Sequence, residues 1–468
     1  MKKRILSLFF AAIFLAMSFT VASAELTGDC NKDGKVDITD LYVLLSSLTK
    51  RSVKQAYYNL DGNDTIDIRD VMVLLHLLEP SQKHITLVAN GYSKYSICAD
   101  DALFDIANAI SASVSDAYGV SIPVTSEDTF PCIKLAVGDT ALGKHGYSFA
   151  IEKNNLIINA SDAQALTYAL GMFKTNCIDN QVKTDFLCFT DDAVLPRESD
   201  APFTLSDALA AKLSITLQHE DLFSYGRKTI GEQKFTTAQG ACTDGKSFYF
   251  IIRMKDDSAC IIVKTDLTGN ELAVSEPLDL GHGNDMTYDS KYDRLVVVHG
   301  TSTKNTSTGN ENGRRLSFVD PETLTVLYTQ ANIIPANYVA GAVAYAENDD
   351  VYYFSAGASV YSIATISEDF VMTYLRNPGR KSRDTEDSSA YTAQGMGTDG
   401  KYIYFPMSLK DTDNILVVYD MNAKYITTLH IPTAMESESL FFIDGELYMF
   451  YNHKGAVMGK APFTAKFE

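Results

Sequence analysis

Two twelve-residue segments near the start of the chain carry oxygen-bearing groups at matching positions. In each segment positions 1, 3, 5, 9 and 12 are Asp or Asn, and position 7 contributes its backbone carbonyl. Calcium takes about six to eight oxygen ligands, and a tight loop turns alternate side chains inward to supply them. The sequence therefore predicts two Ca²⁺ ions, held by Asp29, Asn31, Asp33, Lys35, Asp37 and Asp40 in the first loop and by Asn59, Asp61, Asn63, Thr65, Asp67 and Asp70 in the second.

A second set of residues could act in catalysis or ligand binding. These residues lie just before the first strand in successive units of a repeat in the C-terminal half of the chain. The set is Gln239, His282, Asn284, Asp285, Gln394, Glu436 and Glu438. Asp285, Glu436 and Glu438 could divide the roles of acid, base or nucleophile and orienting carboxylate in glycoside hydrolysis. The other four, Gln239, His282, Asn284 and Gln394, could bind a sugar or a metal ion without turnover. A third interpretation is that the set only satisfies strand ends and channel water.

The repeat that positions these residues begins near residue 235. Five times, a polar start is followed by two aromatic or β-branched strands around a Gly/Asp turn, and the turn residues are Asp244, Asp289, Asn348, Asp399 and Asp444. A period of about 50 residues with about four short strands per unit indicates a β-propeller. We therefore predict five blades whose innermost strands begin at the mouth of a central channel. A long β-sandwich is the alternative.

The paired loops, each followed by an apolar helical run, resemble the dockerin module of cellulosome-type assemblies over residues 27–80. Each loop ends in Asp at position 12, where a full EF-hand has Glu. The resemblance implies a type I-like dockerin that binds the cohesin of a scaffoldin or cell-surface anchor through Ile38, Thr39, Ile68 and Arg69. Two acidic turns ahead of two amphipathic helices are the alternative. Asp64 replaces the Gly that normally makes the sharp turn, which predicts weaker calcium binding in the second loop.

The repeated segments 239–246 and 394–401 resemble secreted Gram-positive propellers that include helveticin-type proteins. This resemblance implies a fold more than a function. Five-bladed arabinanase-like enzymes draw their acids from three inner strands, whereas Glu436 and Glu438 share one blade here. Hydrolysis, binding without turnover, and non-catalytic contact with protein or cell wall therefore all stay open.

Strand and helix patterns alternate between the loops and the repeat. Strands are expected at 84–89, 132–137, 148–152 and 156–160, and two amphipathic helices at about 103–114 and, after an Asp162 cap, about 166–173. The order predicts a small α/β sandwich. Its sequence pattern resembles that of an accessory domain found ahead of some hexosaminidase-like and α-glucuronidase-like glycoside hydrolases. This resemblance implies a carbohydrate-processing context.

Residues 1–24 have the features of a secretion signal, with Lys2, Lys3 and Arg4 before an apolar run and a small-residue cleavage site. The predicted organisation is multidomain: signal peptide 1–24, all-α dockerin 25–82, α/β accessory domain 83–195, linker and closing strand 196–234, and all-β propeller 235–468. No later apolar stretch is long enough to span a bilayer, and the formal net charge of −19 argues against nucleic acid as a partner. We expect a secreted, extracellular subunit that docks to a cohesin and binds or processes polysaccharide.

Overall fold

The structure is a computed structural model, and the chain divides into two compact units, Met1–Ile85 with Cys188–Asp192 and Thr86–Leu187 with Ala193–Glu468. Strands β1 (His84–Ala89) and β7 (Phe186–Thr190) each contain a boundary between the units. The residues described are 30–32, 38–49, 58, 60, 66–71, 74, 84–89, 91–127, 129–179, 186–190, 194, 196–300, 314–331, 333, 340–356, 363–367, 372–376, 391–409 and 412–468.

The first unit contains helix α2 (Ile38–Thr49), which follows the first predicted loop, and a helical segment at residues 68–71 at the end of the second loop. Leu44 of α2 is buried in one apolar cluster with Cys30, Val71 and Leu74. Because the cluster draws on both halves of the duplicated pattern, the two halves share one core.

The second unit begins with a mixed five-stranded sheet in the order β3-β2-β4-β6-β5, with helices α4 and α5. Its elements are β2 (Ser96–Cys98), α4 (Phe104–Tyr118), β3 (Val124–Thr125), β4 (Cys132–Val137), β5 (Tyr147–Glu152), β6 (Asn155–Ala160) and α5 (Ala163–Phe173). Asp162 caps α5 by accepting the N–H of Ala165 at 2.7 Å, as the sequence predicts. The identification of this region as an accessory domain stays a prediction.

Five further sheets form a five-bladed β-propeller, so the architecture predicted for the C-terminal half is confirmed. Blade 1 comprises β10 (Lys228–Ile230), β11 (Gln233–Thr243), β12 (Ser247–Met254), β13 (Cys260–Asp266) and β14 (Glu271–Val274). Blade 2 comprises β15 (Asp285–Asp289), β16 (Arg294–Val298), β17 (Leu316–Val319) and β18 (Val326–Gln330), and blade 3 comprises β19 (Ala340–Ala346), β20 (Val351–Ala356), β21 (Ile363–Ile366) and β22 (Met372–Arg376). Blade 4 comprises β23 (Thr392–Ala393), β24 (Gly397–Thr398), β25 (Tyr402–Leu409), β26 (Asp413–Asp420) and β27 (Tyr425–Ile431).

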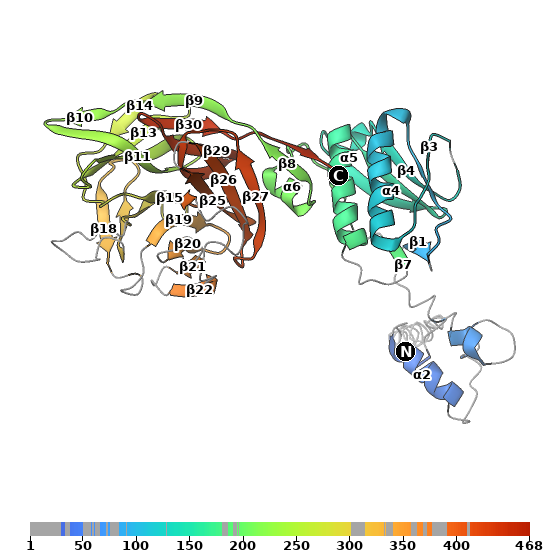
Figure 1. Ribbon diagram of the computed structural model, residues 1–468. Helices are drawn as coiled ribbons and strands as arrows, with labels where there is room; N and C mark the ends of the chain where they lie inside the picture. The colour runs from blue at the N-terminus through green and yellow to red at the C-terminus, as the bar shows by residue number, and fades with distance from the viewer. Residues whose placement is uncertain are drawn as a thin grey trace, which may run out of the picture. The chain divides into compact units, whose positions relative to one another are not determined.

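Blade 5 closes the ring by combining strands from both ends of the propeller sequence. Its strands β28 (Glu436–Ile443), β29 (Glu446–Asn452) and β30 (Ala456–Lys460) are completed by β9 (Glu220–Tyr225), which pairs antiparallel with β30. Figure 1 shows the green β9 beside the red β30. Because the chain's later strands need an earlier one to complete their sheet, the ring has no unpaired gap between its first and last blades.

A short helix and a ribbon complete the propeller part of the chain. Helix α6 (Leu205–Ala210) begins with a capping box between Thr204 and Asp207, and β8 (Ser214–Leu217) pairs with β31 (Phe463–Lys466). Within the described part of the chain, no helix combines the length and the apolar character that crossing a bilayer requires.

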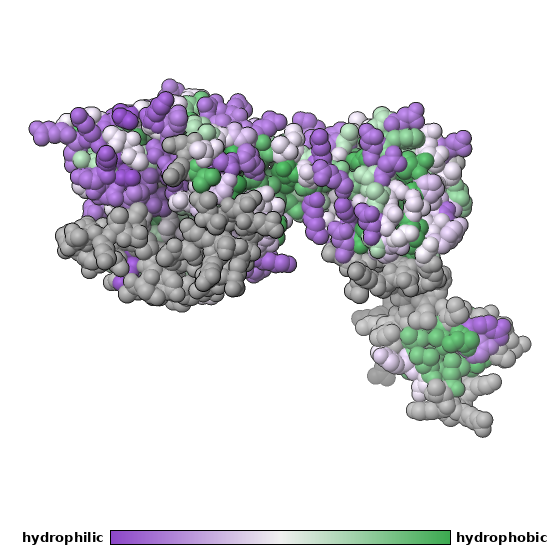
Figure 2. Space-filling model, viewed as in Figure 1, coloured by the Kyte–Doolittle hydropathy of each residue, from purple (hydrophilic) through white to green (hydrophobic). Residues whose placement is uncertain are grey.

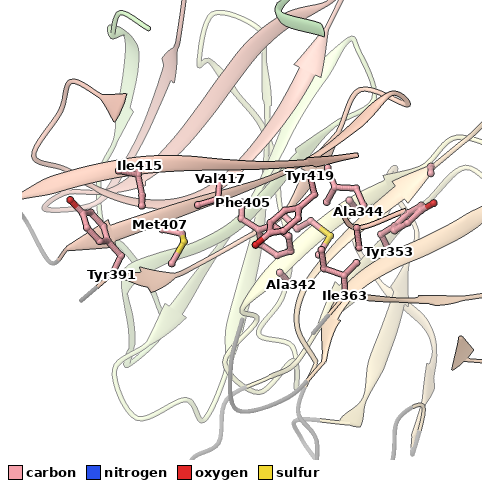
Figure 3. Packing of buried hydrophobic residues seen from close by; sticks show 14 residues of the cluster. Ala342, Ala344, Tyr353, Ile363, Tyr391, Phe405, Met407, Ile415, Val417 and Tyr419 are labelled. Carbon is pink, nitrogen blue, oxygen red and sulfur yellow. The ribbon is translucent and has the colours of Figure 1, made fainter. Parts of the chain in front are cut away.

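Neighbouring blades are joined by buried apolar layers. Figure 3 shows the layer between blades 3 and 4, with Ala344 and Tyr353 on one side and Met407 and Ile415 on the other. Small side chains in β19 leave room for the larger rings of β25 and β26, which fills the wedge between the two sheets. Hydrophilic side chains cover much of the described propeller surface that is visible in Figure 2.

Candidate functional site

The inner strand of a blade starts at the mouth of the central channel, which we call its axial end, and finishes at the hairpin turn, which we call its turn end. Several inner strands are irregular near their axial ends. The pairing register shifts between Ala238 and Ala241 in β11, between Ala340 and Ala342 in β19, and between Ser437 and Ser439 in β28. In blade 4 the inner strand is split into β23 and β24 by residues 394–396. Such irregularities leave a residue unpaired and redirect its side chain. In blades 1, 4 and 5 they coincide with Gln239, Gln394 and Glu438 of the polar set, whereas β15 of blade 2, which begins with Asp285, pairs without a register shift.

Asp285 is completely buried and links four blades directly. Its Oδ2 accepts the backbone N–H groups of Val343 and Met396, each at 3.0 Å, and its Oδ1 lies 2.7 Å from the hydroxyl of Ser439. These donors come from blades 3, 4 and 5, and the Met396 N–H lies in the segment between β23 and β24. Burial raises the pKa of Asp285 to about 8. The carboxyl therefore serves as the polar centre of the ring.

Close approach of the inner strands explains two glycines beside this centre. A Cβ on Gly240 would lie 2.4 Å from the Cα of Asp285, and a Cβ on Gly395 would lie 2.5 Å from the carbonyl oxygen of Glu438. Asn284 adds a further link between blades, since its Nδ2 donates to the carbonyls of Gly341 and, at 3.2 Å, Gln394. The backbones therefore meet around Asn284 and Asp285 with no space for side chains at these glycines.

Glu436 is half-buried and held by two amides. Gln394 Nε2 donates to its Oε1 at 2.8 Å, and Asn452 Nδ2 donates to its Oε2 at 3.3 Å. Gln394 belongs to blade 4, while Asn452 ends β29 directly opposite Glu436 in blade 5. The two amides orient the carboxylate while leaving it partly exposed. It can accept hydrogen bonds from a ligand in this position.

Glu438 has the opposite environment although it lies only two residues away. It sits at the bulge of β28 and is 2% exposed. Burial, and then the negative charge of Glu436, raise the pKa of Glu438 well above its usual value, whereas Arg253 acts in the opposite direction. Glu438 therefore favours its protonated form, which is the form that a general acid requires.

His282 belongs to a separate polar chain with blade 1. Its Nδ1 lies 3.1 Å from Asp257 Oδ2, and Asp257 Oδ1 accepts Arg253 Nη1 at 2.6 Å. Burial, and then Arg253, lower the pKa of His282, so the ring is neutral at pH 7 and donates its Nδ1 hydrogen to Asp257. Gln239, by contrast, is buried and turns its amide onto the carbonyl of Ala238 at 2.6 Å.

The structure thus joins Asn284, Asp285, Gln394 and Glu436 by contacts between blades, with Glu438 beside them. The sequence interpretation missed Arg253, Asp257 and Asn452. Arg253 lies near the end of β12 and Asn452 ends β29, and each is opposite the irregular part of the inner strand of its blade. Considering the residues at the end of the second strand of each hairpin, as well as those before its first strand, would have found both residues.

In the first unit, the carboxylates at the last position of both predicted calcium loops are fully buried. Asp40 Oδ1 accepts the N–H of Asn31 at 2.9 Å, and Asp70 Oδ1 accepts the N–H of Leu60 at 2.7 Å. The described donor set of carboxylate and carboxamide oxygens suits a hard cation such as Ca²⁺. The other predicted ligands lie outside the described residues: Asp29, Asp33, Lys35, Asp37, Asn59, Asp61, Asn63 and Thr65.

The residues predicted to meet a cohesin are at the surface where they are described. Thr39 is exposed and accepts Asn31 Nδ2 at 2.7 Å, and Ile68 is 62% exposed. Arg69 pairs with Asp67 at 2.7 Å. Ile38 begins α2, and its side chain is outside the described set. An exposed isoleucine at the start of a helix is available for apolar contact with a partner.

A cavity of about 310 Å³ lies away from the axis, on blade 5. Its lining includes Phe203, Thr204, Glu446, Lys460 and Phe463, and Lys460 pairs with Glu446 at 2.6 Å. None of the predicted site residues lines it. The polar set at the axis and this cavity are therefore separate features.

No protein-family model and no curated protein sequence matches the chain. Among solved structures, it is similar to a virginiamycin B lyase from Staphylococcus aureus (11% identity, 53% of this chain and 99% of that chain, TM-score 0.30). It is also similar to a gluconolactonase from Xanthomonas campestris (9%, 53% and 97%, TM-score 0.29) and to a soluble aldose sugar dehydrogenase from Escherichia coli (10%, 53% and 99%, TM-score 0.32). The five-bladed assignment follows from the sheets of this chain itself.

Proposed function

We propose that this protein is an exported subunit of a cellulosome-type assembly that binds polysaccharide at the axial end of its propeller. The observation that carries the binding role is the environment of Glu436, a partly exposed carboxylate oriented by Gln394 and Asn452. Sugar hydroxyls are recognised by such fixed acceptors together with amide donors. Binding is the role we infer for this site.

Burial favours binding over hydrolysis. Glycoside hydrolysis requires two carboxyl groups on either side of the scissile bond, about 5–9.5 Å apart. Of the three predicted acids, Asp285 is fully buried and Glu438 is 2% exposed, so only Glu436 offers a substantial surface to a ligand. A polymer chain has one accessible carboxylate to contact among these three.

Hydrolysis is a second candidate because of one specific observation. The raised pKa of Glu438 favours a protonated carboxyl two residues from Glu436, which Gln394 and Asn452 hold in place. A rearrangement that opened Glu438 to a substrate would bring a general acid next to a base or nucleophile. In this second candidate Glu438 is the acid, Glu436 the base or nucleophile, and Asp285 holds the ring together.

A screen on arabinan, xylan and starch separates the two candidates. Affinity electrophoresis detects retention of the full chain, and a reducing-sugar assay on the same polymers detects cleavage. Retention without sugar release is the expected result. Sugar release that disappears in both Glu436→Gln and Glu438→Gln would establish hydrolysis instead, and neither retention nor release on any polymer would count against a saccharide role.

The assembly role that we propose rests on the duplicated loops. Each Ca²⁺ would be held by the six ligands of its loop, and when bound it would neutralise the carboxylates around it and tie the loop to the following helix. Asp40 and Asp70 anchor their loops by accepting backbone N–H groups, which brings both carboxylates inward. Thr39, Ile68 and Arg69, with Ile38, would form the cohesin-facing surface beside the two helices.

Calcium removal tests this role. We expect the affinity of the full chain for a cohesin to fall by at least about a hundredfold in EDTA and to return when calcium is restored, because metal binding and folding are coupled in such modules. A matched magnesium-only sample controls for ionic strength. Cohesin binding that is unchanged by EDTA would rule out the calcium-dependent dockerin.

A further inference from the structure

We propose that Asp285 is protonated in the folded protein and thereby stabilises the contacts between blades at the propeller axis. It then acts as a hydrogen-bond donor as well as an acceptor within the ring of inner strands. The proposal goes beyond the polysaccharide-binding role. It does not depend on which ligand the axial end takes, or on whether it takes one.

The hydrogen count at Ser439 is the first argument. The Ser439 hydroxyl oxygen lies 2.7 Å from Asp285 Oδ1 and 3.0 Å from the carbonyl oxygen of Ala241. A hydroxyl has one hydrogen to donate. If Asp285 were ionised, two acceptors would compete for that hydrogen. If Oδ1 carries a proton, Asp285 donates to Ser439 and Ser439 donates to Ala241, so both contacts are satisfied.

The other carboxyl oxygen fits the same protonation state. Oδ2 accepts the N–H groups of Val343 and Met396 with its two lone pairs, as the carbonyl oxygen of a neutral acid can. Asp285 therefore contacts blades 3, 4 and 5 from blade 2, and Ser439 extends the chain of hydrogen bonds to blade 1. One proton completes a network that reaches all five blades.

Burial disfavours the charged form of Asp285, whereas its hydrogen bonds from Val343, Ser439, Met286 and Met396 favour it. Among the residues that the structure describes, Cys242 on β11 and Glu438 on β28 interact electrostatically with Asp285, and both become anions when they ionise. Strand β19 faces it through the N–H group of Val343, and the segment between β23 and β24 faces it through that of Met396. Burial is the largest cause of its raised pKa, which is about 8.

The proton makes stability depend on pH in a defined direction. An unfolded aspartate titrates near about pH 3.9, whereas the folded pKa of Asp285 is about 8. The folded state therefore retains a proton that the unfolded state has released. The stabilisation is fully present below the unfolded pKa, declines as the pH rises, and is lost above about pH 8.

Asp285→Asn tests the proposal in the full chain. The carboxamide copies the neutral acid, because its Nδ2 can donate to Ser439 while its Oδ1 accepts from Val343 and Met396. Between about pH 5 and about pH 9 the Tm of the wild type should fall by several degrees more than that of Asp285→Asn. Glu438→Gln removes the neighbouring buried acid. In that background, the Tm of the chain with Asp285 should still fall more with pH than the Tm of the chain with Asp285→Asn. Equal pH slopes in the wild type and Asp285→Asn would overturn the proposal.

An infrared measurement on the wild type tests the proposal even if Asp285→Asn does not fold. With aspartate labelled by ¹³C at its carboxyl carbon, the infrared band of a protonated carboxylic acid shifts and is distinguished from glutamate. One aspartate band should persist at neutral pH and disappear with a midpoint far above the ordinary carboxyl range. Its absence at neutral pH would overturn the proposal, whatever the variant does.

Discussion

The two ends of the inner strands satisfy their polar groups in different ways. At the turn end, Asp399 accepts the N–H groups of Lys401 at 2.9 Å and Tyr402 at 2.8 Å, and Tyr404 donates to its second oxygen at 2.6 Å. Asp244 makes the equivalent three contacts in blade 1. Each of these turns is completed within one hairpin, by residues at most five positions away.

At the axial end the partners come from different blades. Asp285 binds donors from three other blades, and Asn284 binds two carbonyls of blades 3 and 4. The residues here vary more than the turn aspartates do, since successive blades contribute Gln239, Asn284, Gly341, Gln394 and Glu438, and only blades 1 and 4 share a residue type. In blades 1 and 4 the turn aspartate is satisfied within its own hairpin, whereas Asp289 at the turn of blade 2 also accepts the hydroxyl of Tyr352 from blade 3. At the axial end, Asn284 and Asp285 together join blade 2 to three other blades.

The largest effect should follow removal of the axial acceptor. Asp285→Ala leaves the N–H groups of Val343 and Met396 buried without their acceptor, and each such loss costs about 1–3 kcal/mol. We therefore expect the free energy of unfolding in urea to fall by about 2–6 kcal/mol at neutral pH. Asp285→Asn is the matched control and should stay close to the wild type. An alanine variant as stable as the asparagine variant would contradict the role of Asp285 at the centre of the ring.

A turn aspartate should have a smaller and local effect. Asp399→Ala removes the acceptor of two turn N–H groups and of the Tyr404 hydroxyl, and we expect a loss of about 1–3 kcal/mol in urea unfolding. Asp244→Ala in blade 1 should cost a similar amount.

Because the two turns share no partner, the double variant should lose the sum of the two single losses within about 0.5 kcal/mol. A large departure from additivity would show that the turns are coupled across the ring, and the contrast between the two ends would then fail.

The same contrast explains how much the sequence predicts. The turn aspartates recur with their flanking strands, so hairpins, blade number and the convergence of strand starts can be derived from the repeat. The caps are also local, as Asp162 shows. The axial network is not local: nothing near Asp285 in the sequence indicates that residues 58 and 111 positions later donate to it. Its residue type alone suggested a catalytic acid.

For a related reason, the sequence pattern does not indicate Arg253, Asp257 and Asn452. They lie at the far ends of strands and turns, where their roles depend on cross-strand register, and the bulges of β11 and β28 shift that register. A bulge changes which side chains face the axis without a composition signal of its own. The predicted calcium ligands, in contrast, follow from spacing within one loop, and they stay a prediction.

The smallest effect on stability should come from Glu436, which is partly exposed. Glu436→Gln keeps a side chain of the same shape and one acceptor oxygen, so the expected change in unfolding free energy is within about 0.5 kcal/mol. Its oxygen can accept from one of the two amides, Gln394 or Asn452, and the other amide can turn its own oxygen toward the new NH2 group. A change of several kcal/mol would mean that Glu436 belongs to the structural network with Asp285.

The most direct test of a functional axial end compares Glu436→Gln with Glu446→Gln, which alters a carboxylate at the turn end of the same blade. Titration calorimetry uses whichever of arabinan, xylan or starch retains the wild type. We expect Glu436→Gln to weaken binding at least about tenfold, or about 1.4 kcal/mol, while Glu446→Gln binds as the wild type does and both variants keep the wild-type Tm. Undiminished binding by Glu436→Gln would rule out a polysaccharide site at Glu436.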